Sequence, residues 1–152
     1  MTYNPTVRTS RRAQFVSNLI LLEFMLLIVQ FIIGMWVNLF AVFPSFGPSL
    51  FMYGMMQVMS SVPELMVHMM NGILIGLVSL MIFIVLATFS DYRLSLLGGT
   101  ASVSVLIAGI SGLEFMFSGF TNNVFSFLMS LGFIFTVIAY SLILYIVPAS
   151  KT

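Results

Sequence analysis

Four long runs of apolar residues, separated by short polar or proline-containing segments, make up most of the chain. The runs cover residues 15–42, 65–89, 94–117 and 124–147. Each exceeds the roughly 20 residues that a helix needs to cross a bilayer. Because the hydrocarbon core offers the backbone no hydrogen-bond partners, such runs cross as helices. The pattern predicts an all-α polytopic membrane protein, in which residues 1–152 form a single four-transmembrane-helix bundle.

The connection between the first two runs carries its own signals. Pro44 and Pro48 end the first helix, because proline cannot continue it. Leu50–Val62 is apolar but too short to span, so we expect a short interfacial helix there, between spans one and two. Pro63 and Glu64 then suit the first turn of a helix, where proline is tolerated and a carboxylate interacts favourably with the helix dipole.

Composition supports the same class and excludes others. The chain is 61% hydrophobic and 6% charged, with a mean hydropathy of +1.17, whereas soluble domains carry about 25% charged residues. A net charge of +1 provides no basic surface for nucleic acid. The absence of cysteine excludes disulfides and thiol chemistry within the chain. No phosphate-binding loop, nucleophile triad or metal-hydrolase motif occurs. We therefore assign no catalytic residues and favour a non-enzymatic function over an enzymatic one.

The basic residues predict an orientation. Arg8, Arg11 and Arg12 precede the first span, Arg93 lies between the second and third, and Lys151 follows the fourth. Four spans place these three locations on one side, and the other two connections contain no lysine or arginine. The positive-inside rule therefore predicts a multi-pass protein of the cell membrane with cytoplasmic N- and C-termini. The lipid bilayer is its first partner.

Small residues mark the expected helix contacts. Lipid gives helices no hydrophobic reason to associate, so close approach through small side chains is needed. Gly72 and Gly76 share one face of the second span, and Ser104, Ala108 and Gly112 share one face of the third. Because a short turn joins these spans, we expect them to be antiparallel neighbours whose two small faces meet.

Polar residues are expected to gather near the extracytoplasmic surface. At 1.5 Å of rise per residue, the following reach a similar depth: Asn38, Glu64, His68 and Glu114, with Asn71 and Ser111 as further candidates. Charged groups inside a membrane usually face the bundle interior or a cavity. We therefore expect His68 and Glu114 to contact each other directly or through one water. This cluster is a candidate ligand-binding site, or else a structural pair that fixes helix register.

Glu23 stands apart, roughly 12 Å from the cytoplasmic end of the first span. Tyr140 and Ser141 of the fourth span reach the same depth and are its expected partners. A structural or protonated carboxyl is the favoured interpretation of this residue, because an ionised group in hydrocarbon is costly.

Methionines near the histidine raise the question of a metal. His68, Met66 and Met70 offer imidazole and thioether ligands, which suit copper(I). Met66-x-x-x-Met70 ahead of Gly-x-x-x-Gly also resembles copper transporters, which carry the two motifs on different helices. Methionine is equally an ordinary apolar filler, and filler is the favoured interpretation. A single histidine cannot form a bis-histidine haem site, so haem would need methionine ligation or a second subunit. No cofactor is therefore predicted, with haem and copper as weaker options.

A resemblance covers much of the chain. Residues 34–40 read Gly-Met-Trp-Val-Asn-Leu-Phe, a proline-containing loop follows, and His68 then precedes a glycine-rich second span. The arrangement resembles small uncharacterised four-helix membrane proteins of archaea and actinobacteria. The resemblance implies the four-span topology and points to Asn38 and His68, but it implies no activity. Glu64-x-x-x-His68 more weakly resembles haem A synthases, which use several histidines where this chain has one.

The chain has almost no soluble part, and its aromatic and methionine-rich faces suit protein contacts within lipid. We therefore predict a small non-catalytic integral membrane subunit or accessory factor of a larger membrane assembly, with a respiratory or redox complex as the candidate host. Its expected partners are other membrane subunits or further copies of itself. The alternative is a small transporter, or a haem- or copper-binding membrane protein, that uses the polar cluster of His68 and Glu114.

Overall fold

The computed structural model describes residues 5–43, 56 and 60–149. Its helices are α1 (Pro5–Phe40), α3 (Pro63–Leu86), α4 (Tyr92–Phe117) and α5 (Asn123–Ala149). Each contains a stretch that is long and apolar enough to cross a membrane. This confirms the predicted all-α architecture with four helices that are long and apolar enough to span a membrane. The interfacial helix expected over Leu50–Val62 falls mostly outside the described residues, which include only positions 56 and 60–62 of this range.

The helix ends follow local sequence signals. Pro63 occupies the start of α3, with Glu64 in the first turn, as the sequence predicts. Asp91 caps α4, because its side chain accepts a hydrogen bond from the backbone N–H of Arg93 at 3.0 Å. Gly119 follows α4 with a φ of +67°, a conformation that glycine adopts without steric cost. These signals hold the turns short, so consecutive helices α3, α4 and α5 run antiparallel.

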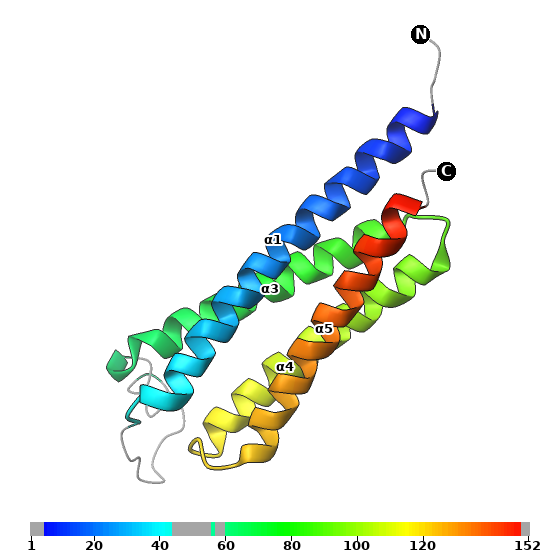
Figure 1. The fold of residues 1–152 in the computed structure, drawn as a ribbon. Coiled ribbons are helices and arrows are strands. Elements are labelled where there is room, and N and C mark those ends of the chain that lie inside the picture. Colours follow the sequence, from blue (N-terminus) through cyan, green and yellow to red (C-terminus); the bar gives the residue numbers. More distant parts are fainter. Residues whose placement is uncertain (1–4, 44–55, 57–59, 150–152) are drawn as a thin grey trace.

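The helices form two closely packed pairs, α1 with α3 and α4 with α5. The start of α1, the end of α5 and the turn between α3 and α4 lie at one end of the bundle (Figure 1). Leu86, Leu94 and Val147 pack in one core cluster with Ala13 at this level. We call this the arginine end, because Arg11, Arg12 and Arg93 lie beside these core residues. The opposite end, with the turn between α4 and α5, is the far end.

A smaller cluster closes the far end. Val37 of α1 packs there with Val62 and with Leu65 of α3. Phe43 stacks on Phe120 with ring centroids 3.7 Å apart and an interplanar angle of 11°. The contact joins the end of α1 to the turn after α4. Both ends of the bundle are therefore held by apolar packing.

The inward faces of α1 and α3 each form a seam with alternating steps of three and four residues. On α1 the seam is Ala13, Val16, Ile20, Glu23, Leu27, Gln30, Gly34 and Val37. On α3 it is Leu65, His68, Gly72, Ile75, Ser79, Ile82 and Leu86. All of these residues are buried or half-buried, and a 3.5-residue repeat is the pattern of helices that pack side by side. Four seam positions are occupied by polar side chains: Glu23, Gln30, His68 and Ser79.

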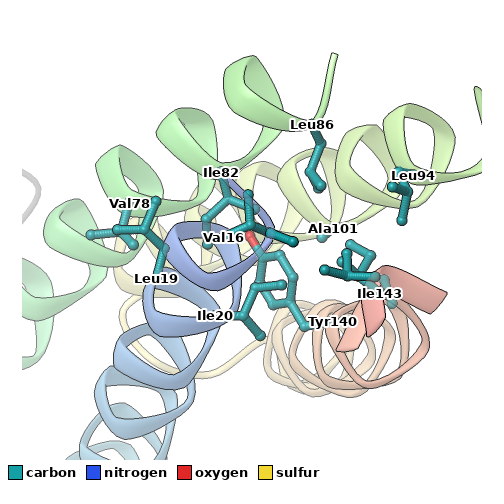
Figure 2. Packing of buried hydrophobic residues seen from close by; sticks show 13 residues of the cluster. Val16, Leu19, Ile20, Val78, Ile82, Leu86, Leu94, Ala101, Tyr140 and Ile143 are labelled. Carbon is teal, nitrogen blue, oxygen red and sulfur yellow. The ribbon is translucent and has the colours of Figure 1, made fainter. Parts of the chain in front are cut away.

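The main core lies toward the arginine end, where all four helices contribute to it. Figure 2 shows Tyr140 of α5 surrounded by Val16 and Ile20 of α1 and by Ile82 of α3. Tyr140, Ile20 and Ile82 have no exposed surface. Because lipid is as apolar as these side chains, their packing stabilises the bundle through close van der Waals contact rather than through removal from water.

The expected meeting of the two small-residue faces is wrong. The face of Ser104, Ala108 and Gly112 on α4 packs on α5. A Cβ atom at Gly132 of α5 would lie 2.6 Å from the Ser104 carbonyl oxygen and 2.9 Å from the Ala108 Cβ. A Cβ at Gly112 would lie 3.2 Å from the sulfur of Met129 on α5. This stripe therefore serves the α4–α5 pair.

The glycines of α3 have other neighbours. Gly72 faces α1, where an added Cβ would lie 3.3 Å from the Gln30 side-chain nitrogen, and Gly76 has nothing within 4 Å. The contact between α3 and α4 uses a different face of α4, on which a Cβ at Gly98 would lie 2.8 Å from Leu86. The short turn makes α3 and α4 neighbours, as expected, but α4 turns its longer small face toward α5.

Candidate functional site

His68 lies in the seam between α3 and α1, where it is half-buried. Its ring packs over Gly34 of α1: a Cβ added there would lie 2.9 Å from the ring carbon Cε1. The ring nitrogen Nε2 is 3.1 Å from the side-chain nitrogen of Gln30. The small residue at position 34 therefore makes room for the imidazole, and Gln30 holds it.

Asn71 connects this pair to the backbone of α1. Its side-chain NH2 group donates hydrogen bonds to the Leu26 carbonyl oxygen at 3.0 Å and to the Gln30 Oε1 atom at 2.8 Å. We call Gln30, His68, Asn71 and the Leu26 carbonyl the amide–imidazole network. It joins α1 to α3 by side-chain hydrogen bonds inside the span, where such bonds help helices to associate.

The network determines the form of the histidine. Because Gln30 accepts from Asn71 through Oε1, its NH2 group is the part that faces His68 and must donate. The His68 Nε2 atom therefore accepts, and the ring proton is on Nδ1. Nδ1 is buried and has no hydrogen-bond partner among the described residues. A doubly protonated ring would place an N–H donor against the NH2 group, so the network requires neutral His68.

The predicted cluster of four polar residues does not form as expected. Asn38, Glu64 and Glu114 have exposed side chains at the far end, while His68 faces α1. Within the described part of the chain, neither ring nitrogen of His68 has Glu114 as a hydrogen-bond partner. The direct form of the predicted contact, a hydrogen bond between His68 and Glu114, is therefore wrong, and the form through one water stays a prediction. Counting residues gave their similar depth, but α3 turns this part of its seam toward α1 rather than α4.

Of the two amide side chains in the network, Asn71 and Gln30, only Asn71 is among the candidates predicted from the sequence. Asn71 is a further candidate of the cluster predicted from the sequence, whereas Gln30 is a residue that the sequence analysis misses. A signal for Gln30 was present, because it follows Glu23 by seven residues and therefore lies on the same helix face. Two polar residues at a heptad spacing in one apolar span indicate an inward-facing seam.

Glu23 is the second polar feature of the seam. It has no exposed surface, and neither carboxyl oxygen has a hydrogen-bond partner in the described ranges 5–43, 56 and 60–149. Tyr140 lies close enough to interact with it electrostatically, but the Tyr140 hydroxyl donates to Ser79 Oγ at 2.7 Å. Ser141 is exposed, and its hydroxyl donates to the Val137 carbonyl oxygen. Tyr140 is therefore a neighbour of Glu23, as expected, but not a hydrogen-bond partner. The expectation for Ser141 is wrong, because its side chain is exposed.

The hydroxyl groups beside Glu23 satisfy one another. Tyr140 donates to Ser79 Oγ, and Ser102 of α4 donates to the Ser79 carbonyl oxygen at 3.1 Å. The Ser79 hydroxyl is 3.1 Å from Ser102 Oγ and is left to donate there. All three hydroxyl protons are thus used, so none of these residues has a donor for the carboxyl group.

The weak metal candidates are not brought together. Met66 is 48% exposed and Met70 is 58% exposed, while His68 faces the interior. Residues two apart on a helix point to roughly opposite sides, so the face shared by Met66 and Met70 is not the face of His68. In the described residues, no group of three or more histidine, cysteine, aspartate and glutamate side chains could hold a metal ion.

Comparison with protein-family models, curated proteins and solved structures finds no match to the chain. The resemblances to small four-helix membrane proteins and to haem A synthases therefore stay predictions. The side chains themselves offer two chemical possibilities. The amide–imidazole network fastens α1 to α3, and the carboxyl group of Glu23 can bind a proton inside the bundle.

Proposed function

We propose that this chain is a small non-catalytic integral membrane subunit or accessory factor of a larger membrane assembly in the cell membrane, with a respiratory or redox complex as the candidate host. The observation that carries the proposal is that the polar side chains fall into two sets, one inside the bundle and one exposed at its far end. Those of the amide–imidazole network, between α1 and α3, bind one another. Those at the far end, Asn38, Glu64 and Glu114, project outward.

The charge distribution supports cytoplasmic termini. Arg11, Arg12 and Arg93 lie at the arginine end, where α1 begins and α5 ends (Figure 1). Positively charged flanks favour the cytoplasmic side. In this orientation the far end, with its exposed carboxylates, faces out of the cytoplasm.

A groove at the far end supports a protein partner. It is shallow and is lined by Ile32, Ile33 and Trp36 of α1 and by Glu64 of α3. Trp36 is 54% exposed, and tryptophan is a residue that commonly anchors protein interfaces. An apolar groove with one carboxylate at its rim fits a transmembrane helix of another subunit that carries a lysine or arginine near its outer end. A second copy of this chain is the competing occupant.

The test combines purification with site-specific crosslinking. The full chain, tagged and expressed in its native membrane, is extracted in mild detergent with a photoreactive residue in place of Trp36. A matched control replaces Leu96, which is 66% exposed on α4. We expect position 36 to crosslink to a different membrane protein that co-purifies in fixed stoichiometry, and we expect Glu64→Gln to weaken this association. Position 96 should give no such product.

Two results would contradict the proposal. One is a folded chain that purifies alone, with no crosslink from position 36. The other is a crosslink only to a second copy of the chain, which would make it a homo-oligomer rather than a subunit of a mixed assembly.

A second candidate function, transport of a proton or small cation, is favoured by the unpartnered carboxyl group of Glu23. Ionisable residues inside membrane spans often mark ion pathways. The structure gives no support to transport or ligand binding by a directly bonded pair of His68 and Glu114. It also gives no support to copper binding by His68 with Met66 and Met70.

A further inference from the structure

Glu23 occupies the middle of the membrane-spanning bundle. Ala13 lies at the level of the arginine end, and Glu23 follows it by ten residues, which is about 15 Å along the helix. The hydrocarbon core of a bilayer is about 30 Å thick. Ile20 and Leu27, the seam residues on either side of Glu23, are buried. The carboxyl group is therefore far from both membrane surfaces and enclosed by apolar side chains.

The charged groups that could stabilise a carboxylate are distant or absent in the described part of the chain. Arg11 and Arg12 lie about 15 Å or more away along α1, and Arg93 lies at the same end. His68 of α3 contacts Gln30, which is seven residues or about 10 Å beyond Glu23. On α4, the titratable Glu114 is exposed at the far end. Tyr140 of α5 is the titratable residue at the level of Glu23.

An ionised Glu23 would be an unpaired charge in a medium that solvates charge poorly, and this is costly. The protonated group is neutral, so its burial costs much less. We propose that Glu23 is a proton-binding site within the membrane, which holds its proton while the bundle is closed and releases it when water reaches the seam. This inference goes beyond the proposed role as a subunit and does not depend on it.

A hydrophobic carbodiimide provides the test, because it enters lipid and reacts with protonated carboxyl groups. The carboxyl oxygen adds to the central carbon of dicyclohexylcarbodiimide and the carboxyl proton moves to a nitrogen, which gives an O-acylisourea without a leaving group. Acyl transfer to the neighbouring nitrogen then yields a stable N-acylurea. The full chain is treated in liposomes, and mass spectrometry of its peptides locates the adduct.

We expect the adduct on Glu23 at acidic pH, with a decline in labelling as the pH rises and the group loses its proton. Glu23→Gln should lose the adduct entirely. Glu114→Gln is the matched control that removes an exposed carboxyl group, and it should leave labelling of Glu23 unchanged. The pH series on the unsubstituted chain needs no variant, so a folding defect in Glu23→Gln cannot hide the answer.

Three outcomes would overturn the inference. The first is an unlabelled Glu23 at acidic pH in a chain whose helix content is intact. The second is labelling that does not change from acidic to alkaline pH, which would indicate a carboxyl group that stays protonated and never releases its proton. The third is protection by sodium but not by choline at constant pH, which would assign the group to a metal cation. Infrared spectroscopy in D2O, which reports the protonated carboxyl band directly, provides an independent readout.

Discussion

Substitution of Gly132 by alanine should force α4 and α5 apart. The added Cβ would lie 2.6 Å from the Ser104 carbonyl oxygen, whereas ordinary contacts begin at 3.4 Å, so the helices must separate locally by about 0.8 Å (3.4 minus 2.6). The Ala108 Cβ, at 2.9 Å, blocks a small sideways shift. Both obstacles belong to backbone or to a Cβ atom, so no rotamer change can relieve them.

The change in the free energy of unfolding caused by Gly132→Ala is the sum of two opposing effects. A gap of 0.5–1 Å costs roughly a quarter to a half of the dispersion energy of each contact it opens, and overpacking typically costs about 1–3 kcal/mol. Alanine is more favourable than glycine in a helix by up to about 1 kcal/mol, which offsets part of this. We expect Gly132→Ala to lower the free energy of unfolding by about 1–2 kcal/mol.

The assay is unfolding of the full chain in mixed micelles with increasing sodium dodecyl sulfate, followed by far-ultraviolet circular dichroism. Gly76→Ala and Gly109→Ala are the matched controls, because an added Cβ at either position meets nothing within 4 Å. They gain the helix propensity of alanine without a clash and should be neutral or slightly stabilising. If Gly132→Ala unfolds at the same detergent fraction as Gly76→Ala, the close approach of α4 and α5 is refuted.

Three further predictions use the same chain. Gln30→Leu removes the centre of the amide–imidazole network and leaves its partners unsatisfied, so it should destabilise the bundle by about 1–2 kcal/mol in the micelle assay. Glu23→Leu removes an unpartnered buried carboxyl group and should stabilise the bundle by about 1–3 kcal/mol, and a loss of stability would contradict the absence of a partner. Arg93→Cys should react with a membrane-impermeant thiol reagent only from the cytoplasm, and Asn122→Cys only from the opposite side.

The sequence predicts the spans well, because hydrophobic runs and helix-ending signals are local properties. Pro63 marks the start of α3 where the structure places it, and α4 begins at Tyr92, two residues before the predicted run over residues 94–117. The described arginines lie at one end, as the alternation of spans requires. Helix–helix pairing is not local. Small residues occur on two faces of α4, one with Gly98 toward α3 and one with Ala108 toward α5, and their spacing does not say which neighbour each face will meet.

In the candidate site, too, the sequence predicts local properties but not the contacts between helices. Depth along a helix follows from counting residues, and this correctly put His68 and Glu114 toward the same end. The direction of a side chain depends on how far each helix is rotated about its axis, and the whole bundle decides that rotation. His68 faces α1 because Gly34 leaves room for its ring there. The orientation of His68 depends on a glycine of α1 and a histidine of α3 together. Neither residue alone indicates that the two will meet.

The two polar features of the seam relate differently to stability. Gln30 and Asn71 form hydrogen bonds that exist only when α1 and α3 are paired, so they favour the closed bundle and its register. Glu23 forms none in the described chain, and an apolar residue at its position would continue the heptad seam without cost. Packing and register therefore explain the amides but give no reason for the carboxyl group. Its chemistry as an acid, rather than its contribution to the fold, is what distinguishes Glu23 from the apolar residues around it.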